Sequence, residues 1–268
     1  MTTLADACAG LAAAGATAAP WLAPYRARGR GVALDVLAGM PVHQALNAAL
    51  RSAPVPMPGE RRLRFVAQSE LPGAEAYEAF IARTACVPTR DNPHDLFNGL
   101  VWLTYAPLKR HLNALQAQQI AQRGIGPTRG AVRDALTLFD ENGAWWQAPA
   151  VLVDALRRRD WHALFIHHRA AWQDSRLTLF GHALLDTLTQ PRKAITAHVW
   201  PVPEGVDAQG LLLRTLDPAA LAGGPCLALP VLGVPQWWPA NQQPGFYDDT
   251  RIFRPAADAG GALQHQGL

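Results

Sequence analysis

The stretch from Arg129 to Trp146, RGAVRDALTLFDENGAWW, constrains the fold more than any other part of the chain. At about 100° per residue, a helix here has one apolar face, formed by Val132, Ala135, Leu136 and Phe139. Its opposite side is polar and carries Arg129, Arg133, Thr137 and Asp140. The segment therefore predicts a helix that buries one face and presents charged groups on the other.

The end of this helix is predicted from Asn142-Gly143, because that dipeptide supplies the positive φ angles of a tight turn or a helix C-cap. Ala144-Trp145-Trp146 then suits a strand. We expect a helix followed by a short hairpin turn, with Asp140 and Glu141 at its tip. An ordinary solvated turn explains the same two acids, since turns favour such residues.

Length and composition indicate a folded chain, with 268 residues of which 49% are hydrophobic and 17% are charged. Such a chain forms a sizeable core. The proline-rich segment 54–59 is the only early linker, and it is too short to mark a domain boundary. We expect an α+β fold over residues 1–255, a mainly helical single domain with a small sheet or hairpins and a long ordered C-terminal loop. Residues 256–268 are expected to fray.

The basic bias is mild, with a net charge of +3 and a pI near 9.0. Lys109 and Lys193 are the only lysines, and the other basic residues are arginines in an alanine-rich chain. A coding bias towards alanine and arginine explains this more simply than selection for phosphate binding. Nucleic-acid binding therefore stays a minor hypothesis.

Cys8, Cys86 and Cys226 are far apart in the sequence, with no C-x-x-C spacing, which favours a reducing compartment. The alanine-rich N-terminus has no basic residue before its apolar run and contains Asp6, so it favours a short helix over an export signal. No apolar run approaches the roughly 18 residues of a membrane span. These features predict a cytoplasmic protein, with export as the alternative.

Asn92-Pro93 gives the clearest helix start in the chain, with an Asn N-cap, Pro at the first helical position and Asp95 in the first turn. We expect this helix to extend to Gln116, although Pro107 weakens its second half. One stripe of it is polar and aromatic and carries His94, Asn98, Trp102 and Tyr105. The stripe resembles the wall of a site. Helix capping by His94 and core packing of Trp102 are the alternative.

Periodicity predicts further helices at residues 4–14, 40–50, 74–85 and 150–159, strands at 64–67 and 195–202, and a short helix or turn at 216–221. Residues 164–166 have strand composition, which would send His167 and His168 to opposite faces. Residues 176–188 predict a helix in which His182 and Asp186 are four positions apart. That spacing lets a carboxylate orient an imidazole, although an exposed pair fits equally.

The segment from Leu229 to Pro255 contains too many prolines for regular structure and too many aromatic residues for a disordered tail. We expect it to wrap over the body as an ordered loop. It would bring Asn241, Asp248, Asp249, Arg251 and Arg254 towards the same region, where salt bridges among them are an equally good explanation.

Four stretches together, NPHDLFNGLVWLTYAPLK, RGAVRDALTLFDENGA, FGHALLD and LPVLGVPQWW with FYDDTRIFRP, resemble a bacterial family known only as a domain of unknown function. The resemblance covers roughly Arg64 to Pro255. It implies a single-domain bacterial protein and brings no activity, cofactor or catalytic residue with it.

Standard phosphate-loop, dinucleotide, serine-elbow and H-E-x-x-H zinc motifs are absent. His94-Asp95 resembles the His-Asp step of HD-type metal phosphohydrolases, but the strands in the middle of the chain argue against that all-helical fold. A divalent metal therefore fits the residue types without any specific motif for one, and the cofactor stays unknown.

Two hypotheses follow. The first is a hydrolase-like enzyme for an anionic or polar small molecule, in which an imidazole is the base or a metal ligand and Arg133 stabilises negative charge. Its candidate catalytic residues are His94, Asn98, Arg133, Asp140, Glu141 and His182, and its candidate substrate-binding residues are Trp102, Tyr105 and Asp248. The second is a non-catalytic ligand-binding or protein-interaction protein. There, Arg133 with Asp134 or Glu141, and Asp248 with Arg251, are structural salt bridges.

Overall fold

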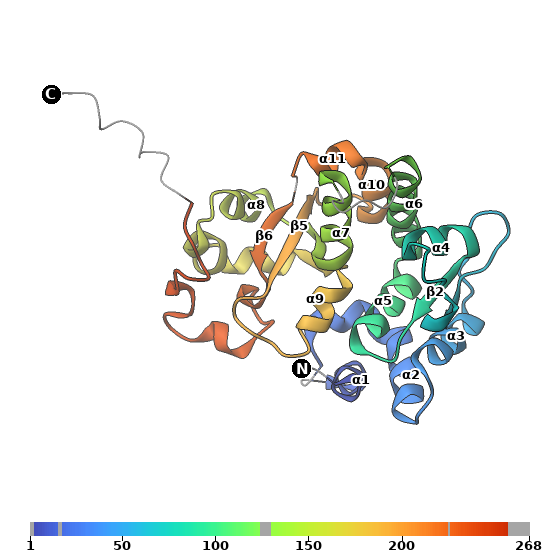
Figure 1. Ribbon diagram of the computed structural model, residues 1–268. Helices are drawn as coiled ribbons and strands as arrows, with labels where there is room; N and C mark the ends of the chain where they lie inside the picture. Colours follow the sequence, from blue (N-terminus) through green and yellow to red (C-terminus); the bar gives the residue numbers. More distant parts are fainter. Residues whose placement is uncertain (1–2, 16–17, 124–129, 225, 257–268) are drawn as a thin grey trace.

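A computed structural model describes residues 3–15, 18–123, 130–224 and 226–256 (Figure 1). The first half is built of helices α1 (Leu4–Ala12), α2 (Arg26–Leu37), α3 (Val42–Ser52), α4 (Tyr77–Thr84), α5 (Pro93–Thr104) and α6 (Ala106–Arg123). Two short parallel strands, β1 (Arg64–Ala67) and β2 (Cys86–Thr89), lie among these helices. This half forms one end of the molecule in Figure 1.

The second half contains a four-stranded sheet in the order β4-β3-β5-β6. Its strands are β3 (Gly143–Gln147), β4 (Arg176–Leu179), β5 (Thr196–Val202) and β6 (Leu227–Pro230). β3 pairs antiparallel with β4 and parallel with β5, and β6 closes the other edge antiparallel to β5. The accompanying helices are α7 (Ala131–Asn142), α8 (Ala150–Arg157), α9 (His182–Thr187), α10 (Ala208–Thr215) and α11 (Pro218–Ala222). The predicted α+β class with mainly helical content is confirmed.

Helix α5 lies at the centre of the first half, and every residue from Asp95 to Leu103 is buried. Its predicted start is confirmed, because the Asn92 side chain accepts a hydrogen bond from the backbone N–H of Asp95 at 2.8 Å. Gly99 lets α3 approach closely, since a Cβ at this position would lie 2.2 Å from Cδ1 of Leu46. The helix ends at Thr104 and α6 begins at Ala106, with Pro107 in its first turn. The predicted single helix to Gln116 is therefore two helices.

The C-terminal segment after β6 is an ordered wrap of short 3₁₀ turns, as predicted. Asn241 is buried and donates from Nδ2 to the carbonyls of Leu232 and Val234, at 2.9 and 2.7 Å. The Tyr247 hydroxyl donates to the carbonyl of Gly233 at 2.9 Å. These bonds fold the wrap back onto its own first turn, directly after β6. The predicted frayed tail lies outside the described residues from 257 onwards.

The hairpin predicted after α7 is wrong. The helix continues to Asn142, so Asp140 and Glu141 lie in its last turn, and the chain enters β3 directly. Gly143 has φ −74° and ψ 152°, an extended conformation rather than the left-handed one of a tight turn. Glycine is needed here for space, because a Cβ would lie 2.2 Å from the carbonyl oxygen of Phe139. Arg129, predicted on the polar side of this helix, lies outside the described residues.

The strand predicted at residues 164–166 is also wrong, because Ala163–His167 forms a short π-helix followed by a 3₁₀ helix at Arg169–Asp174. The Asp160 carboxylate accepts from the backbone N–H of Ala163 at 2.9 Å and favours the helical start. Leu164 and Phe165 are both buried although they are adjacent, a pattern that a strand with one buried face does not give.

The helix predicted for residues 176–188 is correct only in its second half. Arg176–Leu179 forms β4, which pairs with β3, and α9 begins at His182. Pairing with a buried strand outweighs the helical pattern of these four residues. Sequence periodicity did not predict helix α2. Its two glycines, three arginines and one aspartate leave little apolar periodicity.

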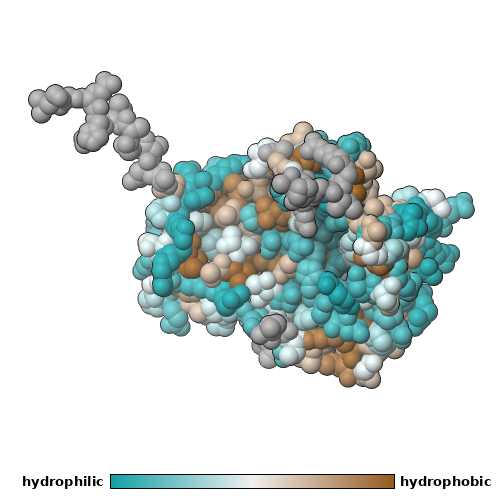
Figure 2. All heavy atoms as spheres, viewed as in Figure 1, coloured by the Kyte–Doolittle hydropathy of each residue, from teal (hydrophilic) through white to brown (hydrophobic). Residues whose placement is uncertain are grey.

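No helix of the described ranges is long and apolar enough to cross a membrane. The surface in Figure 2 is mostly hydrophilic where α5, α7 and α9 meet, in the view of Figure 1. Helices α5 and α9, α6 and α7, and α7 and α9 pack against one another there. The two halves of the chain thus join along these four helices.

The junction between α7 and α9 depends on Gly181. A Cβ there would lie 2.4 Å from the Glu141 carbonyl oxygen and 2.5 Å from the Asn142 nitrogen, both backbone atoms that cannot rotate away. We expect Gly181→Ala to lower the free energy of unfolding by about 1–3 kcal/mol, the usual cost of overpacking. Chemical denaturation monitored by tryptophan fluorescence measures this change.

Gly31→Ala is the matched control, because Gly31 is an exposed residue of α2 and a Cβ there meets nothing within 4 Å. Because alanine has a higher helix propensity than glycine, this variant should raise the free energy of unfolding by about 0.5–1 kcal/mol. Equal stability of Gly181→Ala and the wild type would show that α7 and α9 do not approach as closely as described.

Candidate functional site

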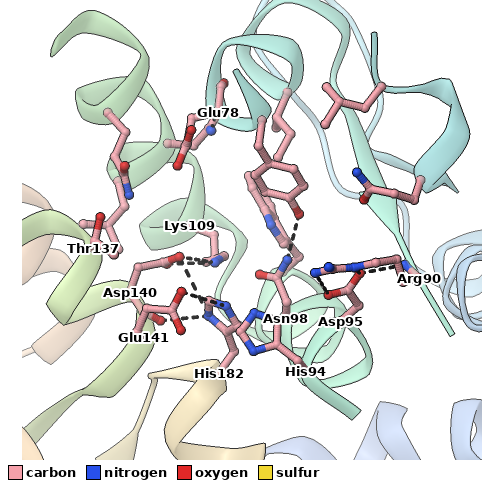
Figure 3. A pocket seen from close by; sticks show the side chains of 18 residues that line it. Glu78, Arg90, His94, Asp95, Asn98, Lys109, Thr137, Asp140, Glu141 and His182 are labelled. Atoms are coloured by element: carbon pink, nitrogen blue, oxygen red, sulfur yellow. Dashed lines mark hydrogen bonds and ion pairs between the residues drawn. The ribbon is translucent and has the colours of Figure 1, made fainter. Parts of the chain in front are cut away.

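A polar pocket of about 400 Å³ lies where the two halves of the chain meet. Helices α4, α5 and α6 from the first half, and α7 and α9 from the second, line it (Figure 3). Six of the predicted site residues contribute to its wall, namely His94, Asn98, Trp102, Asp140, Glu141 and His182. The expectation that the polar stripes of separate helices converge is met for these residues.

Three of these side chains form a group suited to a metal ion. One ligand atom from each of His94, Glu141 and His182 lies within 4.8 Å of the other two. The two imidazole rings meet edge to face with centroids 4.6 Å apart, and Nε2 of His182 lies 3.9 Å from Oε1 of Glu141. Each residue comes from a different helix, and Figure 3 shows the three side chains pointing towards one another.

His182 is held by its other ring nitrogen. Nδ1 lies 2.9 Å from the backbone carbonyl oxygen of Asp140, a distance at which the Nδ1–H donates a hydrogen bond. This bond fixes the tautomer whose Nε2 lone pair faces Glu141 and His94. Metal-binding histidines are commonly oriented by such a bond to a carbonyl.

The same imidazole is neutral near pH 7. Burial, together with the nearby Lys109 and His94, lowers the pKa of His182 to about 3, against the opposing effect of Asp140. A neutral imidazole is the form that coordinates a metal.

A buried ion pair crosses the pocket wall. Nζ of Lys109 in α6 lies 2.7 and 2.9 Å from the two carboxylate oxygens of Asp140 in α7. The Lys109 side chain is 5% exposed, and the Asp140 side chain is 19% exposed. Burial raises the pKa of Asp140, but the Lys109 ammonium, its hydrogen bond to the carboxylate, and the imidazoles of His182 and His94 together lower the pKa below its ordinary value. Asp140 therefore stays ionised at neutral pH.

The remainder of the pocket lining carries hydrogen-bonding groups and an ion pair. Nδ2 of Asn98 donates to the Tyr77 hydroxyl at 2.9 Å, and burial raises the pKa of Tyr77, so that its phenol is protonated at neutral pH. Arg90 makes a bidentate pair with Asp95, with both N–O distances at 3.0 Å. Trp102 is 1% exposed and packs beneath Lys109, whose Nζ lies 5.7 Å from the ring centroid.

Three predicted site residues lie outside this pocket. Tyr105 packs in the core against Tyr25, Trp145 and Phe180. Arg133 is on α7 but does not line the pocket. Asp248 lies on the C-terminal wrap, where its exposed carboxylate is 3.2 Å from Nε2 of His162.

Two ionic pairs expected from the sequence, His182 with Asp186 and Asp248 with Arg251, are not the ones that the structure forms. His182 contacts Asp140 and Glu141 of α7 rather than Asp186. Burial raises the pKa of Asp186 above its ordinary value, and His94 opposes this only in part. Arg251 pairs with Asp249 at 3.0 Å rather than with Asp248.

Several pocket residues were missed from the sequence, chiefly Tyr77, Arg90, Lys109, Asn113 and Gln116. A usable signal was present in α6, where Lys109, Leu112, Asn113 and Gln116 follow the i, i+3, i+4, i+7 spacing of one helix face. The break at Pro107 hid this face. Tyr77 and Arg90 carry no such signal, because only the tertiary fold brings them here.

The Lys109–Asp140 pair gives a stability prediction. Lys109→Met leaves the largely buried Asp140 carboxylate without its cation, so we expect the free energy of unfolding to fall by about 2–4 kcal/mol, somewhat less than for a fully buried pair. The double variant Lys109→Met/Asp140→Leu should recover much of this loss, because neither charge then remains buried. Urea denaturation of the variants measures both values.

Arg157→Ala is the matched control, since the Arg157–Asp154 pair is exposed, at 58% and 51% for the two side chains. Its loss should change the free energy of unfolding by less than about 1 kcal/mol. If Lys109→Met changed stability no more than Arg157→Ala, the buried pair would not join α6 to α7.

Comparison with known proteins gives a family without an activity. No curated protein and no solved structure matches the chain. The family model described as "Protein of unknown function (DUF3025)" matches residues 63–257, which contain the whole pocket lining from Gln68 to His182. The predicted resemblance to a family of unknown function is thereby confirmed, and the chain belongs to the DUF3025 family.

Proposed function

We propose that this protein is a metal-dependent hydrolase whose His94, Glu141 and His182 hold one divalent transition-metal ion. The observation that carries the proposal is the convergence of two imidazoles and one carboxylate to within 4.8 Å in a polar pocket. Two histidines and a glutamate are the protein ligands of several catalytic zinc sites, which keep a fourth position for water or substrate.

The geometry fits an ion with small movements. Ligand atoms about 2.0–2.2 Å from a tetrahedral zinc ion lie about 3.3–3.6 Å from one another. The 3.9 Å between His182 and Glu141 and the 4.8 Å limit for the triad are slightly larger. Rotation of the partly exposed His94 and Glu141 side chains closes the difference, while His182 stays fixed by the Asp140 carbonyl.

A divalent ion at this position supplies Lewis acidity and a bound water of lowered pKa. The protein residues then have separate tasks. Asp140 orients His182 through its backbone carbonyl and keeps Lys109 at the edge of the site through its carboxylate. Trp102, Leu112 and Ile81 restrict water around the reacting groups. Asn98 and its neighbours in the pocket lining bind the substrate.

The hydrolase proposal differs from the first hypothesis in the role of Arg133. No arginine without a carboxylate partner lines the pocket in the described part of the chain, since Arg90 is paired with Asp95. The ion therefore takes over the stabilisation of negative charge that the sequence suggested for Arg133. A ligand-binding protein without catalysis is the remaining alternative, and turnover separates the two.

Metal binding is the first test. Metal-stripped protein titrated with Zn²⁺ in a calorimeter should bind about one ion per chain, and His182→Ala and Glu141→Ala should each weaken binding at least about 100-fold. At a free zinc concentration of about 100 times Kd, the bound ion should raise the free energy of unfolding by about 2.7 kcal/mol.

His162→Ala is the control for this titration, because His162 is an exposed histidine that lies beside Asp248 outside the pocket. It should leave zinc affinity unchanged. Zinc affinity unaffected by His182→Ala would contradict the proposed ligand set. Iron as the native metal, found by elemental analysis, would favour oxygen chemistry over hydrolysis.

Catalysis is the second test. Zinc-loaded protein should hydrolyse a chromogenic ester or anilide at a rate that falls at least about 100-fold in His94→Ala, as expected for loss of the ion. The His162→Ala variant serves again as the control. One bound ion with no turnover on esters, anilides or phosphate esters would instead support the non-catalytic alternative.

A further inference from the structure

Three nearly buried carboxamide side chains line the pocket that contains the metal-ligand candidates. Asn98 on α5 and Asn113 and Gln116 on α6 all line the pocket, and their exposed fractions are 6%, 9% and 5%. Buried amides are expected to be hydrogen-bonded. Their concentration in the pocket therefore indicates which groups a ligand presents to it.

Asn98 has one unused polar end. Its Nδ2 donates to the Tyr77 hydroxyl, while its Oδ1 is buried and has no hydrogen-bond partner among the described residues. Figure 3 shows the Asn98 side chain in the pocket near His94 and His182. Asn98 also lies four residues after His94, so both project from one face of α5. The unused end therefore lies next to the metal ligands.

The end of the Asn98 carboxamide that does not bond Tyr77 can be satisfied by a ligand that carries both a hydrogen-bond donor and an acceptor. Asn98 and the Tyr77 hydroxyl can exchange the direction of their hydrogen bond, and either the oxygen or the nitrogen of the carboxamide then faces the ligand. A carboxamide ligand matches both arrangements, because it has an N–H and a carbonyl. A phosphate or carboxylate offers only acceptors at neutral pH and matches one.

The charges of the wall also oppose an anion. The cations of the wall, Arg90 and Lys109, already pair with Asp95 and Asp140. Glu78 and Glu141 add two further carboxylates. With histidine neutral, the whole pocket lining therefore carries two positive and four negative formal charges. A divalent ion brings this sum to zero. The pocket with its ion is thus neutral, and an uncharged ligand meets no unbalanced charge.

We infer that the substrates are small uncharged carboxamides, recognised by Asn98 beside the metal ligands and by Gln116 elsewhere on the pocket wall. This inference rests on the proposed function for the reaction itself. In that reaction the water oxygen bonds to the carbonyl carbon and the C–N bond breaks. One water proton goes to the departing nitrogen, and the second, released when the carboxylic acid ionises, protonates the amine, so the products are a carboxylate and an ammonium ion. No oxidant or reductant is required.

Three probes of equal ring size test the ligand class, namely benzamide, benzoate and phenyl phosphate. Each is titrated into metal-free protein and followed by NMR chemical-shift changes. Benzamide should bind at least ten-fold more tightly than either anion. Asn98→Ala and Gln116→Ala should each weaken benzamide binding about five-fold, the factor expected for one hydrogen bond.

Gln118→Ala is the matched control, because Gln118 lies on the exposed side of the same helix as Gln116. It should not change benzamide binding. The Gln116→Ala comparison keeps the test decisive if Asn98→Ala does not fold. Benzoate or phenyl phosphate binding as tightly as benzamide would overturn the inference. So would unchanged benzamide affinity in folded Gln116→Ala and Asn98→Ala.

The metal-free titration separates this inference from the proposed function. Benzamide preference in a protein that takes up no zinc would support the carboxamide pocket and refute the hydrolase. Zinc uptake in a protein that prefers phenyl phosphate would support the metal site and refute the carboxamide class.

Discussion

The ion pair between Lys109 and Asp140 joins the two halves of the molecule, and the pocket depends on it. Lys109 belongs to α6 of the helical half, and Asp140 belongs to α7, which leads directly into the central strand β3. A buried carboxylate near the C-terminal end of a helix is unfavourable by itself, because the helix dipole is negative there. The lysine offsets both this repulsion and part of the desolvation cost. The pair therefore fixes the position of α7 relative to α6.

The same helix end accounts for the character of the site. Glu141 follows Asp140 in the last turn of α7, whereas His94 and His182 lie in the first turns of α5 and α9. The positive ends of two helices thus meet the negative end of a third, which is a favourable arrangement of dipoles. Gly181 permits this approach, since any side chain there would strike the backbone of Glu141 and Asn142. Packing and electrostatics consequently place the two imidazoles beside the carboxylate.

Local signals in the sequence predicted much of this arrangement. The N-cap at Asn92 predicted the start of α5 correctly, and the apolar face of α7 is confirmed, with Leu136 and Phe139 buried as expected. Polar stripes on those helices identified His94, Asn98 and Asp140. His182 was identified for a different reason, its spacing from Asp186, although in the structure it contacts Asp140 and Glu141 of α7 and His94 of α5.

The failures arose where tertiary contacts outweigh local preference. Asn142-Gly143 has the composition of a turn, but Gly143 serves the close contact with Phe139 and adopts an extended conformation. Residues 176–179 have a helical pattern, but they pair with β3. Tyr77 and Arg90 reach the pocket only through tertiary packing, in which α4 lies against α6 and β2 lies against α5. No pattern within a short window encodes such contacts.

The position of the three metal-ligand candidates in the chain has a consequence for folding order. His94 and His182 lie in different halves, and Glu141 lies on the first helix after their junction. Contacts between residues so distant in sequence form late, because the intervening chain must lose entropy before they are made. We therefore expect the pocket to be completed when the halves dock, late in folding. An ion or ligand that binds there selects the docked molecule and acts as a cross-link between halves that share no disulfide in the described chain.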